Sequence, residues 1–179
     1  MNTNQQVQTI IIRKAQKGDS IAIETLYRQY NKGMFSICAR MMGTVADAED
    51  VLQDAFIKAF KNLNQLKNVD QFGGWLKRIV INECINNSKK KWAWGDLNED
   101  HDVEDEEDFN WWDGVDINDI NIAIKQLPDG CRQIFTLFVI EDYSHKAIAA
   151  EMQISESTSK SQYHRAKQLL KQQLNKKFR

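Results

Sequence analysis

Apolar residues recur every three or four positions along most of the chain, which is the spacing of helices with one buried face. This pattern predicts helices over about residues 6–16, 20–41, 46–63, 72–91, 117–126 and 129–140, followed by two more near the end of the chain. No stretch carries a strand pattern of any weight, and one proline with eight glycines supplies few turn residues for a sandwich or barrel. The sequence therefore predicts an all-α fold.

Local signals mark where several of these helices begin. Asp19 follows Gly18 and can cap the second helix with its carboxylate. Thr44 follows Gly43 and can cap the third helix, with Asp47 three positions later in an approximate capping box. The stretch 64–71, which precedes the fourth helix, is polar and lacks any period, so we expect a loop there.

The segment Leu127–Leu174 contains a short amphipathic run and a long one, separated by a tight break. Ile148 and Met152 lie on the apolar stripe of the first run, and Ser155 stands where the second helix needs an N-cap. This is the layout of a helix-turn-helix, in which the second helix enters the DNA major groove. The polar positions expected on its outer side are Thr158, Lys160, Ser161, His164 and Arg165. From this segment alone, a solvated helix face remains an equal alternative to a DNA-binding one.

Charge is distributed very unevenly, although the formal net charge is only −1. Residues 1–92 carry a net charge of +6, residues 93–120 contain no Lys or Arg and carry −12, and residues 121–179 carry +5. Like charge without periodicity is typical of an extended linker. We therefore expect two small helical domains, residues 1–92 and 119–179, joined by a flexible acidic linker over residues 93–118.

Cysteine and histidine give no sign of a metal centre. The three cysteines are far apart in the sequence and form no C-x-x-C pair, so we expect no zinc site and no other cofactor. Asp47, Asp50 and Asp54 share one helix face, which raises the alternative of a metalloenzyme, but no histidine is paired with such carboxylates as helical di-metal sites require. An odd cysteine count with no signal peptide and no membrane-spanning run predicts a cytoplasmic protein that is not inserted in the membrane.

Three blocks, in this order, resemble the extracytoplasmic-function (ECF) sigma factors of bacterial RNA polymerase. They are AQKGDSIAIETLYRQY, then DAEDVLQDAFIKAF with FGGWLKRIVINECIN, and finally LPDGCRQIFTLFVIEDYSHKAIAAEMQISESTSKSQYHRAK. The resemblance spans nearly the whole chain. It implies a non-enzymatic factor that binds core RNA polymerase, recognises the minus-35 promoter element through the helix-turn-helix, and melts the minus-10 element through the first domain. It also makes an anti-sigma factor an expected partner.

The resemblance assigns three sets of residues. The polymerase-binding set is Asp47, Glu49, Asp50, Gln53 and Asp54. The minus-10 set is Lys67, Asn68, Asp70, Arg78, Asn82, Asn86, Lys89 and Lys90. The minus-35 set is Thr158, Lys160, Ser161, His164, Arg165 and Lys167. For each set, the alternative is a solvated surface, and a helix-turn-helix regulator that acts without polymerase is the alternative for the whole chain.

The recognition unit departs from the family pattern at three positions. Gln153 stands where the family usually has Gly at the turn, Ser159 where it usually has a buried Val, and Gln162 where it often has Arg. A buried serine in place of valine loses packing of about 1–2 kcal/mol. We therefore expect these departures to affect local stability and DNA specificity and to leave the fold unchanged.

Overall fold

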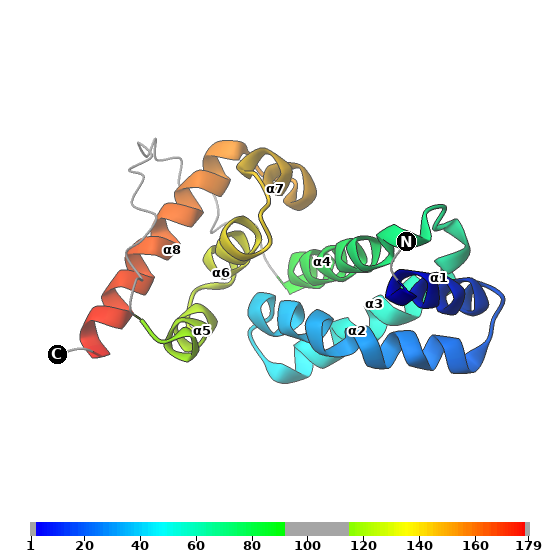
Figure 1. Cartoon of the computed structure of the whole chain (residues 1–179). Coiled ribbons are helices and arrows are strands. Elements are labelled where there is room, and N and C mark those ends of the chain that lie inside the picture. Colours follow the sequence, from blue (N-terminus) through cyan, green and yellow to red (C-terminus); the bar gives the residue numbers. More distant parts are fainter. Residues whose placement is uncertain (1–2, 92–114, 178–179) are drawn as a thin grey trace. The chain divides into compact units, whose positions relative to one another are not determined.

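The computed structural model describes residues 3–91 and 115–177, and these residues form helices and short turns without any strand. They divide into two compact units, which together leave most of the predicted acidic linker, residues 93–114, outside the described residues. The all-α prediction is therefore confirmed for the described part of the chain (Figure 1).

The first unit is built from four helices and two short 3-10 turns. They are α1 (Thr3–Gln16), α2 (Ser20–Met41), α3 (Val45–Lys61), η1 (Leu63–Gln65), η2 (Val69–Gln71) and α4 (Phe72–Lys91). The predicted helix bounds agree with these to within a few residues. The predicted loop at 64–71 contains the two 3-10 turns, which carry the chain from α3 into α4.

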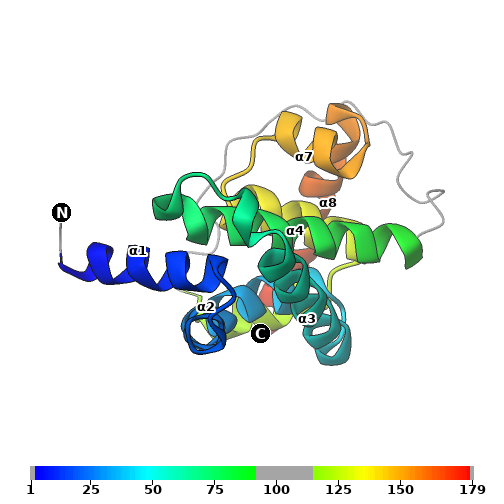
Figure 2. The ribbon, with the colours of Figure 1, turned by 90° about the vertical axis from the view of Figure 1, so that its right-hand side faces the viewer.

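Helix α2 packs against the three other helices of this unit. The Tyr27 ring meets Phe56 of α3 edge-on, with 4.8 Å between centroids, and the Tyr30 ring meets Phe72 of α4 at 5.1 Å. The Tyr30 hydroxyl accepts a hydrogen bond of 3.1 Å from the Gln8 amide of α1. Burial and aromatic contact on several sides therefore hold α2 in place. The ribbons of α1, α2, α3 and α4 can be followed in Figure 2.

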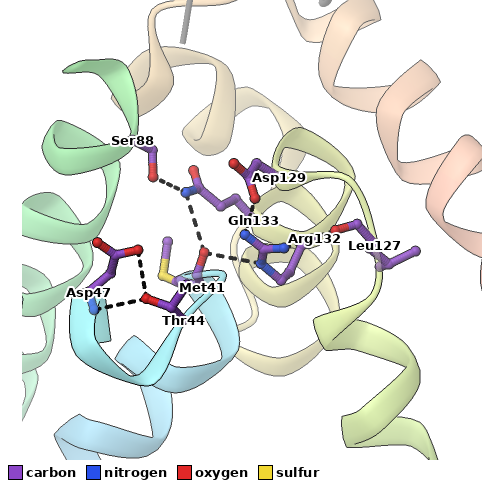
Figure 3. A network of polar contacts seen from close by, with 8 residues as sticks. All are labelled: Met41, Thr44, Asp47, Ser88, Leu127, Asp129, Arg132 and Gln133. Atoms are coloured by element: carbon purple, nitrogen blue, oxygen red, sulfur yellow. Dashed lines mark hydrogen bonds and ion pairs between the residues drawn. The ribbon is translucent and has the colours of Figure 1, made fainter. Parts of the chain in front are cut away.

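The predicted helix caps are present. The Asp19 carboxylate accepts from the Ala22 backbone N–H at 3.0 Å, and the Thr44 hydroxyl accepts from the Asp47 N–H at 3.1 Å. The Thr44 hydroxyl also donates to the Asp47 carboxylate at 2.8 Å (Figure 3). Asp47 thus supports the cap through the hydroxyl, whereas a full capping box would use the Thr44 backbone N–H.

The second unit is centred on one long helix. It contains α5 (Ile117–Lys125), α6 (Asp129–Phe135), a π turn η4 (Thr136–Ile140), α7 (His145–Met152) and α8 (Glu156–Lys177). Helix α8 packs against α5, α6 and α7. The apolar core of the second unit consists of Ala123, Ile124, Leu127, Cys131, Phe135, Ala166, Leu170 and Leu174. At the start of α6, the Arg132 guanidinium donates to the Leu127 carbonyl at 2.9 Å and pairs with Asp129 (Figure 3).

Two sequence predictions about burial were wrong. The apolar spacing over 129–140 predicts one helix that buries Phe138 and Ile140. The helix instead ends at Phe135 and continues as the π turn, so Phe138 is only half-buried and Ile140 is 39% exposed. A π turn contains more residues than an α turn, so the α-helical period no longer places side chains correctly beyond it. The apolar spacing over residues 20–41 likewise predicts that Tyr27 lies on the buried side of α2, but Tyr27 is 40% exposed.

Candidate nucleic-acid and protein interfaces

Helices α7 and α8 form the predicted helix-turn-helix. The Ser144 hydroxyl caps α7 by accepting from the Ala147 N–H at 3.2 Å, and the Ser155 hydroxyl caps α8 by accepting from the Thr158 N–H at 2.9 Å. Between them Gln153 adopts a left-handed conformation, with φ +60° and ψ 45°. This is a conformation that glycine reaches without strain, which explains why a turn of this kind favours glycine.

Helix α8 has a distinct outer face. Arg165 is exposed, and Lys160, Ser161, His164 and Lys167 are partly exposed. Four of these side chains already have neighbours. The Lys160 amine lies 3.8 Å from the Glu156 carboxylate, and the Ser161 hydroxyl donates to the Thr158 carbonyl at 3.1 Å. Nε2 of His164 lies 3.0 Å from the Gln168 amide, and the Lys167 amine lies 5.7 Å from the Tyr163 ring centre. Such exposed contacts are weak enough for a ligand to replace them.

Thr158 does not belong to this outer face. Its side chain is 93% shielded from solvent, and its hydroxyl lies 2.7 Å from the capping hydroxyl of Ser155. The position was assigned outward from its sequence spacing, and the structure corrects that assignment. The polar buried side of the first turns of α8 also includes Ser159 and Gln162.

The two buried departures from the family pattern have polar partners. Ser159 is fully buried, and its hydroxyl lies 2.9 Å from Nδ1 of His145, the first residue of α7. The buried Gln162 carbonyl oxygen accepts from the Cys131 thiol of α6 at 3.1 Å. Burial raises the pKa of Cys131 to about 11, against an opposing effect of the Arg165 charge, so this thiol stays protonated and able to donate.

In the first unit, the residues predicted for the minus-10 element fall into a turn group and a helix group. Lys67, Asn68 and Asp70 are all exposed, and the Asn68 side chain is occupied by accepting from the Asp70 N–H at 3.1 Å. Arg78, Asn82 and Asn86 follow one another at intervals of four along α4 and therefore share one face of that helix. Lys89 is half-buried, and the side chain of Lys90 lies outside the described residues.

Asp70 lines a surface hollow that the sequence did not predict. The hollow has a volume of about 580 Å³. Its polar lining comes from Gln5 and Gln8 of α1, Gln29 and Tyr30 of α2 and Asp70, and its apolar lining comes from Val7, Ile11, Val69 and Phe72. Amide, hydroxyl and carboxylate groups around apolar walls can hold a flat heterocyclic ring and hydrogen-bond its edge. Lys67 and Asn68 do not line it.

The acidic face of α3 lies beside a second hollow. Glu49, Asp50, Gln53 and Asp54 are exposed, whereas Asp47 is half-buried and engaged in the cap. Glu49 and Gln53 line a hollow of about 440 Å³ together with Leu52 and with Tyr27, Asn31, Lys32 and Phe35 of α2. The contribution of α2 was missed because the apolar period of that helix assigns Tyr27 to the core.

The described residues hold no cluster of three or more metal-ligating side chains, Asp47, Asp50 and Asp54 included. Within the same residues no helix has the length and apolarity needed to cross a membrane. The surfaces considered for function are the two hollows described above, the outward face of α4 and the outward face of α8.

Comparison with known proteins places both units in one class. Residues 26–93 match the family model Sigma-70 region 2, and residues 119–170 match Sigma-70, region 4. The chain is 30% identical to the ECF RNA polymerase sigma factor SigW of Bacillus subtilis, over 91% of this chain and 94% of that protein. It is also 30% identical to the RNA polymerase sigma-H factor of Pseudomonas aeruginosa, over 95% and 94%.

Solved structures share the fold. The sigma factor RpoE of Bartonella quintana, in complex with the anti-sigma factor NepR, matches with a TM-score of 0.54 and 20% identity, over 85% of this chain and 96% of that one. CnrH, in complex with the cytosolic domain of CnrY, matches with a TM-score of 0.51 and 19% identity, over 94% and 97%.

Proposed function

The chain belongs to the ECF sigma factors, which bind RNA polymerase and direct promoter-specific transcription initiation, and from this premise we propose a role for each surface described above. Helix α8 reads the upstream (minus-35) promoter element, the first unit opens the downstream (minus-10) element, and the acidic face of α3 binds core polymerase. The protein is not an enzyme, and it acts in the cytoplasm with the polymerase.

The outward face of α8 carries the minus-35 proposal. Lys160, His164 and Arg165 lie on the side opposite the buried stripe of Ala166 and Leu170, so they can enter the major groove while the stripe stays packed. Lysine and arginine contact phosphates and guanine, and serine and histidine can add hydrogen bonds. Ser161 and Lys167 complete this face, and Thr158 contributes through the cap that begins the helix.

The hollow at Asp70 supports the minus-10 proposal. Opening a duplex requires that at least one base leaves the stack, and a pocket that receives this base offsets part of the cost of unstacking. The hollow offers both apolar walls and edge-binding amides, while Arg78, Asn82 and Asn86 offer a polar face for the strand backbone. By the family resemblance, Lys67, Asn68, Lys89 and Lys90 are assigned to the same promoter element.

The polymerase proposal rests on the acidic face of α3 together with the hollow next to it. Glu49, Asp50 and Asp54 supply charge that steers a basic partner, and Tyr27 with Phe35 supplies apolar area that a partner can bury. An anti-sigma factor that covers this face would hold the protein inactive. The two solved relatives, each determined with a bound protein, support a partner of this kind.

Two pairs of substitutions test whether α3 binds polymerase and α8 binds promoter DNA. Asp50→Lys with Asp54→Lys should weaken binding of purified core polymerase by at least tenfold at moderate salt, with Asp50→Asn and Asp54→Asn giving a smaller loss. Lys160→Ala with Arg165→Ala should leave polymerase binding unchanged but weaken holoenzyme binding to a promoter duplex selected from a random library, with a smaller salt dependence. Equal effects of both pairs in both assays would refute the assignment.

A further inference from the structure

The buried contact between His145 and Ser159 links the two helices of the helix-turn-helix. His145 is the first residue of α7, and Ser159 lies in the first turn of α8, fourteen positions later. Their side chains meet at 2.9 Å between Nδ1 and Oγ, with Ser159 fully buried and His145 only 9% exposed. The sequence predicted a loss of packing at Ser159, and in the structure the Ser159 hydroxyl forms a hydrogen bond with His145 there.

The imidazole ring belongs to a cluster of three aromatic rings. Phe138 of the π turn stacks on His145 with 4.2 Å between ring centroids and 15° between planes. Tyr163 of α8 lies 5.6 Å from His145 and 4.7 Å from Phe138. Stacking on Phe138 holds the plane of the imidazole ring, and the hydrogen bond to Ser159 directs Nδ1 toward α8.

A hydrogen bond constrains orientation more tightly than an apolar contact does. Its strength falls steeply as the donor angle departs from linearity, whereas two methyl groups in contact can slide past each other with little loss. The bond therefore constrains the angle of α8 relative to α7. Lys160 and Ser161 follow Ser159 directly, so the same constraint governs where the outer face points.

We propose that His145 and Ser159 are positioning residues, whose hydrogen bond sets the orientation in which α8 presents its outer face to promoter DNA. This inference rests on the proposed DNA-reading role of α8. In this chain a hydrogen bond stands where the family pattern has a buried valine. We predict that this hydrogen bond affects the sequence specificity of α8 for the upstream element, although neither residue contacts DNA.

The test is a double-mutant cycle with reconstituted holoenzyme. The variants are His145→Ala, Ser159→Ala and the double variant, with Ser159→Thr retaining the hydroxyl and Ser36→Ala making the same deletion at an exposed serine of α2. The probe is the promoter duplex selected by the wild-type holoenzyme from a random library. Thermal unfolding first establishes a temperature at which each variant is fully folded. Binding is measured at that temperature, so that loss of the fold is separated from loss of the orientation of α8.

Each single alanine variant should weaken binding about 5- to 10-fold, and the double variant should be no weaker than the weaker single variant, because both remove the same bond. The salt slope should stay unchanged, since no phosphate contact is lost. Selection repeated with the Ser159→Ala holoenzyme should return a less defined upstream sequence. Ser159→Thr should bind within about twofold of wild type, and Ser36→Ala should match wild type.

Two outcomes would overturn the proposal. If Ser159→Ala selects the same upstream sequence with wild-type affinity, or if the two single losses simply multiply in the double variant, the pair does not position α8. Failure of the wild-type holoenzyme to select any upstream sequence would instead refute the proposed role of α8 itself, so the two failures are distinguishable.

Discussion

The cores of the two units differ in the kind of side chain that they bury. The first unit packs apolar and aromatic side chains, with Tyr30 against Phe72 and Tyr27 against Phe56, and its polar groups lie mainly on its surface. The second unit buries polar side chains inside its DNA-reading half, where Ser159 meets His145 and Gln162 meets Cys131. An apolar core tolerates change in proportion to volume, whereas a core with polar pairs depends on each partner being present.

The first unit also buries one hydrogen-bonded pair, formed by its two thiols. Cys38 and Cys84 are fully buried in the first unit with their sulfur atoms 3.9 Å apart, and neither forms a disulfide. The hydrogen bond with Cys38, together with burial, raises the pKa of Cys84 well above its ordinary value. These two cysteines are far apart in the sequence, and only the packing of α2 on α4 brings them together.

The largest effect is expected in the apolar core of the first unit. Phe72→Ala should lower the free energy of unfolding by about 3–5 kcal/mol, because Phe72 is 1% exposed and its ring packs against Tyr30 and Trp75. Urea unfolding followed by circular dichroism measures the change. Ile57→Ala, at a position that is 46% exposed on α3, serves as the control and should cost less than about 1 kcal/mol. Equal costs would mean that burial does not dominate this core.

The second effect is expected at high pH in the second unit. Burial raises the pKa of Cys131 to about 11 from an ordinary value of 9.0, so above pH 9 the unfolded chain ionises this thiol and the folded chain does not. The thiol's contribution to stability is complete below pH 9 and falls by at most about 1.4 kcal/mol per pH unit until pH 11. The stability difference between wild type and Cys131→Ala should therefore shrink across this range. A constant difference would contradict the buried, neutral thiol.

A third prediction separates the packing argument from the polar-pair argument. Packing alone predicts that Ser159→Val increases stability, because valine adds buried apolar surface. The structure predicts a loss of about 1–2 kcal/mol, because valine leaves the buried Nδ1 of His145 without its partner at this position. His145→Phe combined with Ser159→Val should recover most of this loss. Urea unfolding of the wild type and these two variants decides between the arguments, and a Ser159→Val variant more stable than wild type would favour packing.

The smallest effect is expected at the turn. Gln153→Gly should raise the free energy of unfolding by about 0.5–1 kcal/mol, because Gln153 has a positive φ that glycine adopts without steric cost. Gln153→Ala should bring no such gain, since alanine also carries a Cβ. Thermal unfolding of the two variants side by side measures the difference. Equal stability of the glycine and alanine variants would show that the left-handed backbone carries no measurable strain.

Much of the molecule could be predicted from the sequence because the signals that decide it are local. Helix periods, the caps at Asp19, Thr44 and Ser155, and the break at Gln153 each depend on residues within a few positions of one another. The acidic face of α3 was predicted for the same reason. The resemblance that pointed to the ECF sigma factors rests on these short blocks taken in order.

Only the tertiary structure decided which polar residues face inward. Sequence spacing placed Thr158 on the outer face of α8 and Tyr27 in the core of α2, and packing reversed both assignments. The partner of Ser159 lies across a turn on another helix, and the hollow at Asp70 needs side chains from α1, α2 and the η2 turn. A periodic pattern states that a helix has a buried side. It does not state which neighbouring helix covers that side, because that choice depends on contacts between residues distant in the sequence.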